Sequence, residues 1–581
     1  MSKSPEDDAG VDPITFTVLW DRLVSICEEM GITLQRTGKS EAVSAGQDFS
    51  TALFDRQGRM IAQGNFSPGH LGAMPFTVDH VLDRFSHDDL GAGDGIVLND
   101  PQLGSGHLPD FFLISPVVID DRIEAFAVNV AHQIDVGGLA PGSQAVEATE
   151  LYQEGLRLFP SKAIESGEIQ RWFLDLLDAN VRLPDTLVGD FKAQQNANHR
   201  GTTLYTELFE EFGAATLSTV TESILDQSER RVRSSIEEMP DGEYAFEDQV
   251  DSVGVDSGPV EVAVRVVIDG DEVTFDYADS DPATQSAINS YINYTRAYTI
   301  FAFKSVTEKH LHQNEGVIRP LTIEAPEGSF FNPQPPTAGG ARPILNARIV
   351  DLAMGALSQA IPERTVAASS HWGNPNFGGV DPDTGEPFVV YDVVVGGLGA
   401  SAAGDGAEGV ASSFNLTNIP VEIHENRYPV LIEELGLTTD SGGAGRHRGS
   451  LGLRKDFTML ADDVRLTNLM ERSESRPWGL FGGRPGDTGR TIRHSDGERQ
   501  KIHSKGTYTL SEGDTVSFRV SGSGGYGDPI EREPDAVRRD VEKGFVSTDE
   551  AREAYGVAIT EVGDGFEVDR EATAELRASM R

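Results

Sequence analysis

The sequence predicts an α+β protein built from several structural units. Its 581 residues are enough for three or four units. Helical and hairpin patterns alternate before residue 140, amphipathic helical patterns dominate from 140 to 235, and short strand patterns dominate from 415 to 530. We therefore expect four consecutive regions: an α/β region with a candidate metal site (1–240), a mixed central region (241–415), a β-rich region (416–530) and a helical tail (531–581).

The first elements follow from local signals. Asp12 can cap a helix that has Pro13 in its first turn, and Gly31 can end it. Residues 49–63 read as a hairpin with its turn at 55–58. Residues 66–85 begin as a loop rich in glycine and proline, which carries His70, and continue as a helix.

The later elements follow from periodicity. Three stretches have the apolar spacing of amphipathic helices: 148–160, 169–201 and 203–239. Alternating residues from 240 to 285 predict strands, with a hairpin turn at 269–271. Shorter helices are expected at 290–310 and 349–362. Ser547 and Glu550 form a capping box at the start of a helix in the tail.

The composition excludes several classes of function. The net charge is −45, from 48 basic and 93 acidic side chains spread along the chain. Such a surface repels nucleic acid and anionic membranes, and it is typical of adaptation to high salt. The acidic N-terminus and the lack of an 18-residue apolar run predict a cytoplasmic protein without a membrane span. Cys27, the single cysteine, is expected to be buried and not to act as a nucleophile.

The candidate site lies between residues 99 and 135. Strand patterns at 111–119 and 123–130 flank a short turn, so opposed residues should sum to about 242, which places Asp110 opposite His132. Opposed side chains have Cβ atoms about 4.5–5.5 Å apart, within reach of one ion. His107, in the loop before Asp110, can turn toward the same point, and Asp100 and Asp135 lie at neighbouring strand ends. Imidazole and carboxylate ligands together suit a divalent metal.

Each of these residues taken alone is more often a solvated turn residue, because Asp and Asn favour turns. The hairpin register favours a shared site for His107, Asp110 and His132 taken together. The spacing matches no zinc-finger or H-E-x-x-H pattern.

Two glycine-rich segments were weighed as anion sites. Arg446 and Arg448 lie in a glycine-rich loop and could hold a carboxylate or a phosphate, or could simply join two strands. The segment 521–529 (SGSGGYGDP) lacks the Gly-Lys-Ser/Thr ending of a phosphate loop, so a structural turn is favoured. No ATP-binding loop and no G-x-S-x-G nucleophile elbow is recognisable.

The chain resembles the hydantoinase B/oxoprolinase family over about residues 11–557. The resemblance rests on stretches in the family's order: DPITFTVLWDRL, QDFSTALFD, PGHLGAMPF, GIVLNDPQLGSGHLPD, NVAHQIDVGG, FKAQQNANHRG, EGVIRPLTIEAPEGSFFNP, ENRYPVLIEELGLTTDSGGAGRHRGSLG and SGGYGDPIEREPDAVRRDVEKGFVS. The GHLPD and GGYGDP elements are together highly specific.

The resemblance implies an enzyme subunit that hydrolyses a hydantoin or 5-oxoproline ring together with a hydantoinase A-type subunit that binds ATP. It implies a divalent metal (Mn, Zn, Fe, Co or Mg) on His107, Asp110 and His132. The family often has an acidic residue just before D-F-S; here Ser44 to Gln47 precede Asp48, so Asp48 or Asp100 could serve as a further ligand. Asp48 and His70 are the candidate catalytic residues, with His70 as acid or base because imidazole titrates near neutral pH. A subunit of a ketone carboxylase (acetone or acetophenone type) and a non-catalytic scaffold remain the alternatives.

Overall fold

The computed structural model describes residues 12–416, 418–563 and 565–581. The chain divides into two compact units, each made of separate segments. Unit 1 comprises residues up to 243, 265–346 and 413–416, and unit 2 comprises 244–264, 347–412 and the part from 417 onward. The four consecutive regions expected from the sequence describe the local order of elements, whereas the division by contacts is twofold. The mixed helix and sheet content confirms the α+β class.

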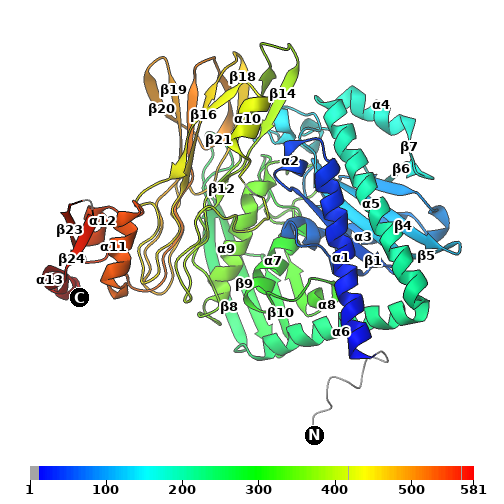
Figure 1. Ribbon diagram of the computed structural model, residues 1–581, viewed down its shortest axis with the longest axis horizontal. Helices are drawn as coiled ribbons and strands as arrows, with labels where there is room; N and C mark the ends of the chain where they lie inside the picture. Colours follow the sequence, from blue (N-terminus) through cyan, green and yellow to red (C-terminus); the bar gives the residue numbers. More distant parts are fainter. Residues whose placement is uncertain (1–11, 417, 564) are drawn as a thin grey trace, which may run out of the picture. The chain divides into compact units, whose positions relative to one another are not determined.

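Unit 1 is built on a seven-stranded sheet (Figure 1). Its strands, in spatial order, are β2 (Met60–Gln63), β1 (Phe49–Asp55), β5 (Arg122–His132), β4 (Asp110–Ile119), β3 (Gly95–Leu98), β6 (Ser161–Glu165) and β7 (Glu168–Ile169). Alternate residues of β1 point to opposite faces, so Leu53 joins one apolar core and Phe54 the other. Both faces of the sheet are therefore covered.

Helices form the two covering layers. On one face α1 (Pro13–Thr37) packs beside α5 (Pro184–Phe212), and α6 (Ala214–Glu237) follows α5 (Figure 1). On the other face lies α3 (Pro68–Arg84), which packs against α7 (Ile292–Val306). A short helix, α4 (Arg171–Asn180), packs on α5. Within unit 1, the second half of β9 (Val260–Asp269) pairs with β10 (Glu272–Asp276), and β11 (Leu321–Glu324) adds in parallel.

Unit 2 contains a β-sandwich. One sheet has the order β14 (Pro387–Tyr391), β13 (Asn376–Val380), β18 (Val464–Leu469), β21 (Lys505–Leu510). The other has the order β16 (Val430–Leu437), β17 (Leu453–Met459), β22 (Thr515–Arg519), β19 (Arg490–Ser495), β20 (Glu498–Ile502). Side chains from both sheets, such as Phe377 and Phe518, share one apolar core. The unit also holds α9 (Asn346–Leu357, from residue 347) and α10 (Val421–Arg427).

The tail of unit 2 is only partly helical. It holds α11 (Pro534–Glu542), α12 (Thr548–Glu553) and α13 (Arg570–Met580), but also a hairpin of β23 (Ala558–Val562) and β24 (Gly565–Asp569) that the sequence analysis missed. Ser547 caps α12 as predicted, accepting a hydrogen bond from the Glu550 amide. In the segment 521–529, a Cβ on Gly522 or Gly524 would lie within 2 Å of a neighbouring backbone oxygen. These glycines therefore serve close backbone packing, as the structural interpretation expected.

Three local predictions were wrong, each for a packing reason. Helix α1 does not end at Gly31 but runs to Thr37, because this glycine makes room for the ring of Phe66, 2.1 Å from a Cβ built there. His70 lies on α3 and not in a loop, because Gly69 and Gly72 let the helix approach α7 closely. Residues 148–160 form only a short 3₁₀ turn, since Gly155 has φ = 129°, which no helix allows.

The hairpin predictions hold elsewhere. The hairpin at 49–63, the turn at Gly270 and the helices at 292–306 and 346–357 are present. Cys27 is buried, and burial raises the pKa of its thiol. No helix in the described part of the chain is long and apolar enough to cross a membrane.

Candidate metal centre

The candidate site is set by the hairpin of β4 and β5. Asp120 and Asp121 form its two-residue turn, both left-handed with φ of 49° and 59°, as the favoured hairpin turns require. A bulge between Val117 and Val118 shifts the register by one residue near the turn, and beyond it Asp110 pairs with His132. The predicted register is therefore confirmed at the end of the hairpin that carries the site.

Three histidines surround one oxygen of Asp110. Its Oδ1 lies 2.8 Å from His107 Nε2, 3.1 Å from His132 Nδ1 and 3.5 Å from His70 Nε2. His107 comes from the loop before β4, His132 from the end of β5 and His70 from the first turn of α3. The ligand atoms of His107, Asp110 and His132 all lie within 4.8 Å of one another.

Asp48 completes the cluster from the residue before β1. Its backbone carbonyl accepts a hydrogen bond from the amide of His132 at 3.0 Å, which joins the two strand ends. Its carboxylate oxygens lie 3.9 Å from His70 Nε2 and 3.9 Å from His132 Nδ1. The structure thus brings together five of the predicted residues: Asp48, His70, His107, Asp110 and His132. We call these five residues the Asp110 cluster.

The second oxygen of Asp110 is held separately. Ser105 Oγ and the guanidinium of Arg342 both donate to Oδ2. Arg342 also stacks on Tyr294, with its guanidinium carbon 3.6 Å from the ring centroid. Burial alone would raise the pKa of Asp110, but His107 and Arg342 hold it well below its usual range. Asp110 is therefore ionised, with Oδ1 turned to the histidines.

The protonation of His107 shows that these residues fit a cation. Burial, and after it the charge of Arg342, lowers the pKa of His107 to about 3, so its ring carries one proton at neutral pH. Its Nδ1 lies 3.3 Å from the carbonyl oxygen of Gly340, and its Nε2 faces Asp110 Oδ1. With the proton on Nδ1, two lone pairs oppose each other at 2.8 Å. A divalent cation would turn that repulsion into two ligand bonds.

Asp100 and Asp135 lie outside the Asp110 cluster. Asp100 pairs with Arg157 at 2.5 Å and caps the turn that follows it through the amides of Gln102 and Leu103. Asp135 pairs with Arg182 at 2.8 Å and accepts from the amides of residues 137, 142 and 182. Both carboxylates organise loops on either side of the hairpin.

The two candidate anion-binding arginines belong to unit 2. Arg448 is buried and pairs with Glu408 at 2.7 Å. Arg446 is half exposed, stacks on Tyr526 and lies 3.7 Å from Glu531. Both guanidinium groups already have acidic neighbours.

Sequence reasoning missed Arg342, Ser105 and Tyr294. Arg342 follows Asp110 by 232 residues, and neither its neighbours nor their spacing signal a site. Ser105 stands inside the motif SGHLPD, where a hydroxyl near a carboxylate was the one available signal.

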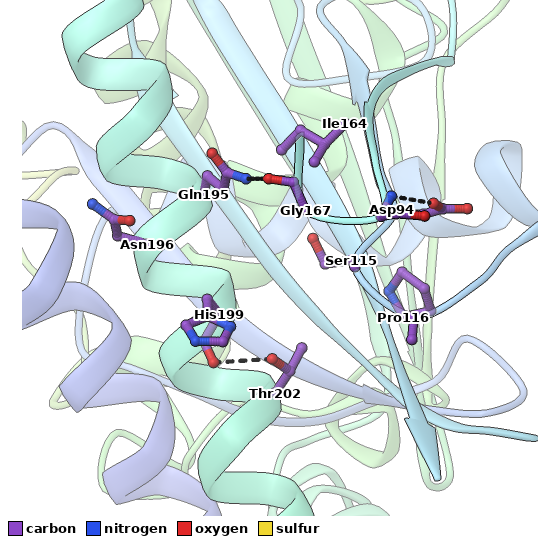
Figure 2. Close-up of a pocket in the computed structure, with 12 residues that line it drawn as sticks. Asp94, Ser115, Pro116, Ile164, Gly167, Gln195, Asn196, His199 and Thr202 are labelled. Atoms are coloured by element: carbon purple, nitrogen blue, oxygen red, sulfur yellow. Dashed lines mark hydrogen bonds between the residues drawn. The ribbon is translucent and has the colours of Figure 1, made fainter. Parts of the chain in front are cut away.

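A separate pocket of about 600 Å³ lies on unit 1 between α5 and the edge of the sheet (Figure 2). Figure 2 shows Gln195, Asn196 and His199 of α5 on one side, with Asp94 and Ser115 across from them. No member of the Asp110 cluster lines it. The largest hollow described here is thus not the candidate metal centre.

Comparison with known proteins identifies the family. The family model described as hydantoinase B/oxoprolinase matches residues 12–529, so the chain belongs to this family. The caprolactamase subunit beta of Pseudomonas jessenii is 32% identical, covering 98% of this chain and 99% of that protein.

Two solved structures share the fold. The ATP-dependent caprolactamase from Pseudomonas jessenii matches with a TM-score of 0.92 and 30% identity, over 98% of this chain and 100% of the other. The nucleotide-free acetone carboxylase structure matches with a TM-score of 0.91 over 100% of this chain and 84% of the other. Its 20% identity makes it evidence of the fold alone.

Proposed function

We propose that this chain is the B-type subunit of an ATP-dependent amidohydrolase that opens a cyclic amide, a hydantoin, 5-oxoproline or a lactam. The observation that carries the proposal is the Asp110 cluster, five buried metal- and proton-binding side chains in a family whose name and full-length relatives denote hydrolysis of such rings. The partner is an A-type subunit that binds ATP, since this chain shows no nucleotide-binding motif.

The cluster suits a borderline divalent metal. His107, Asp110 and His132 would hold it, and a set rich in imidazole favours Mn, Fe, Co or Zn over Mg. Such a metal polarises a carbonyl or lowers the pKa of a bound water.

The remaining side chains have separate roles. Ring opening adds water to the amide carbonyl carbon, breaks the C–N bond and delivers a proton to the leaving nitrogen. His70 is placed to move that proton, because its buried Nδ1 has no hydrogen-bond partner within the described residues. Asp48 adds negative charge 3.9 Å from the His70 ring, which favours its protonated form. Arg342 and Ser105 keep Asp110 ionised and oriented.

The test uses the complex with its A-type partner. With ATP present, we expect turnover of at least one ring from a panel of hydantoin, 5-oxoproline and caprolactam, and none without ATP. His107→Ala and His132→Ala should each lower turnover at least 100-fold while the complex still assembles on gel filtration. His199→Ala, on the exposed surface of α5, is the matched control and should retain activity.

Two outcomes would favour the alternatives. If ATP-dependent fixation of bicarbonate onto acetone or acetophenone occurred and no ring opened, the chain would be a carboxylase subunit. If the two histidine variants kept full activity, the chain would be a scaffold for its partner. Ring opening at full rate without ATP would contradict the proposed mechanism.

We also propose that the protein works at high salt. The support is its net charge of −45, which burdens the folded state with self-repulsion unless salt screens it.

A further inference from the structure

Glu154 is a buried carboxylate that the proposed mechanism does not use. It follows the short 3₁₀ turn at Leu151–Gln153 in unit 1, and 1% of its surface is exposed. Its Oε1 accepts hydrogen bonds from the amides of Gly339 at 2.9 Å and Gly340 at 2.6 Å. Its Oε2 has no hydrogen-bond partner in the described part of the chain. A buried carboxyl group with half of its oxygens unpaired is costly to keep, so a role beyond filling space is expected.

The two amides that Glu154 holds belong to a segment that reaches the Asp110 cluster twice. The carbonyl oxygen of Gly340 lies 3.3 Å from His107 Nδ1. Two residues later, Arg342 donates to Asp110 Oδ2. Residues 339–342 therefore set both the ring of His107 and the carboxylate of Asp110.

The fit of this segment requires its two glycines. A Cβ on Gly340 would lie 2.9 Å from Glu154 Oε1, and a Cβ on Gly339 would lie 3.0 Å from the ring of Tyr291. The peptide between these glycines is thus held between Glu154 and Tyr291, with its place decided by the carboxylate.

We propose that Glu154 is a positioning residue for the metal centre: by holding the amides of Gly339 and Gly340, it places the Gly340 carbonyl against His107 Nδ1. This selects the His107 tautomer with the proton on Nδ1 and leaves the Nε2 lone pair facing Asp110 Oδ1, ready for a metal. Such partners of metal-bound histidines fix ring orientation and tautomer, and their loss costs about 10–100-fold in metal affinity or activity. The role as a metal-site partner rests on the proposed function, whereas the tautomer it selects does not.

The test compares Glu154→Ala with Glu154→Gln in the full complex. After removal of metal with a chelator, Mn²⁺ and Zn²⁺ are titrated in turn, and [¹⁵N]histidine spectra of the metal-free protein report the His107 tautomer, assigned with His107→Ala. We expect Glu154→Ala to weaken metal binding about 10–100-fold and to remove the Nδ1–H signal of His107. Glu154→Gln keeps an oxygen acceptor for both amides and should restore most of each.

Asp94→Ala is the matched control for a purely structural loss. Asp94 is also a buried carboxylate of unit 1 that accepts from two backbone amides, those of Gly91 and Ser166. It should lower thermal stability without changing metal affinity or the His107 tautomer. If Glu154→Ala behaved in the same way, the positioning role would be refuted.

The two proposals fail in different ways. If the wild-type complex bound neither metal, the proposed metal chemistry would fail, while the tautomer comparison would still decide the role of Glu154. If metal bound normally but the tautomer did not respond to Glu154→Ala, the inference on Glu154 alone would fall.

Discussion

Replacing Arg342 by methionine tests whether the charge on Asp110 depends on its buried partner. The side chains of Arg342 and Asp110 are 4% and 0% exposed, and the guanidinium is already stacked on Tyr294. Methionine keeps most of the apolar volume but leaves the carboxylate without its cation. Removing one partner of a buried pair costs about 3–5 kcal/mol, because the other charge stays buried and uncompensated.

A surface pair of similar geometry supplies the control. Arg171 and Asp175 lie 2.6 Å apart on α4, with side chains 84% and 56% exposed. An exposed pair with this helical spacing contributes only about 0.3–0.5 kcal/mol. Arg171→Met should therefore be nearly silent.

Urea-induced unfolding followed by circular dichroism measures both variants, with and without saturating Mn²⁺. We expect a loss in the free energy of unfolding roughly tenfold larger for Arg342→Met than for Arg171→Met. The loss should shrink with metal, since the cation supplies positive charge beside Asp110. Equal losses for the two variants would refute the claim that Asp110 is a buried, ionised anchor of the site.

Three further predictions concern pH, salt and packing. Burial raises the pKa of Glu154 from 4.5 to about 8, so the folded protein keeps a proton that the unfolded chain releases. Stability should therefore fall as pH rises through this window, by at most about 1.4 kcal/mol per unit, and Glu154→Gln should flatten the slope; an unchanged slope would contradict the shift. Raising KCl from 0.1 to 1 M shortens the Debye length from about 10 to 3 Å and should raise the melting temperature; a salt-independent melting temperature would argue against adaptation to high salt. Gly31→Ala should cost about 1–3 kcal/mol in thermal or urea unfolding by overpacking against Phe66, and a second change, Phe66→Leu, should recover part of it. If the double variant were no more stable than Gly31→Ala, the clash would lie elsewhere.

Local sequence signals predicted the hairpin that carries the site, including the opposition of Asp110 and His132. Strand side chains repeat every two residues, and a short turn fixes which residues meet, so register can be worked out without the rest of the fold. The motif GHLPD then added His107, and the order of motifs along the chain identified the family.

The glycines of α3 show where local reasoning failed. Gly69 and Gly72 in a segment with two prolines read as a loop, yet they serve close contact with α7. A glycine that makes room for another helix has the same local appearance as one that breaks a helix, so only the neighbour distinguishes the two.

The amino-acid sequence by itself determined the class of fold, the family, and a hairpin that sets Asp110 opposite His132. Only the tertiary structure decided which charges compensate them. It separated Asp100 and Asp135, each paired with its own arginine, from the Asp110 cluster, and it brought in Arg342 and Glu154. The physical reason is sequence distance: Arg342 meets Asp110 across 232 residues, and Glu154 meets Gly340 across 186. Contacts of that span depend on how whole layers pack, which no local pattern of side chains encodes.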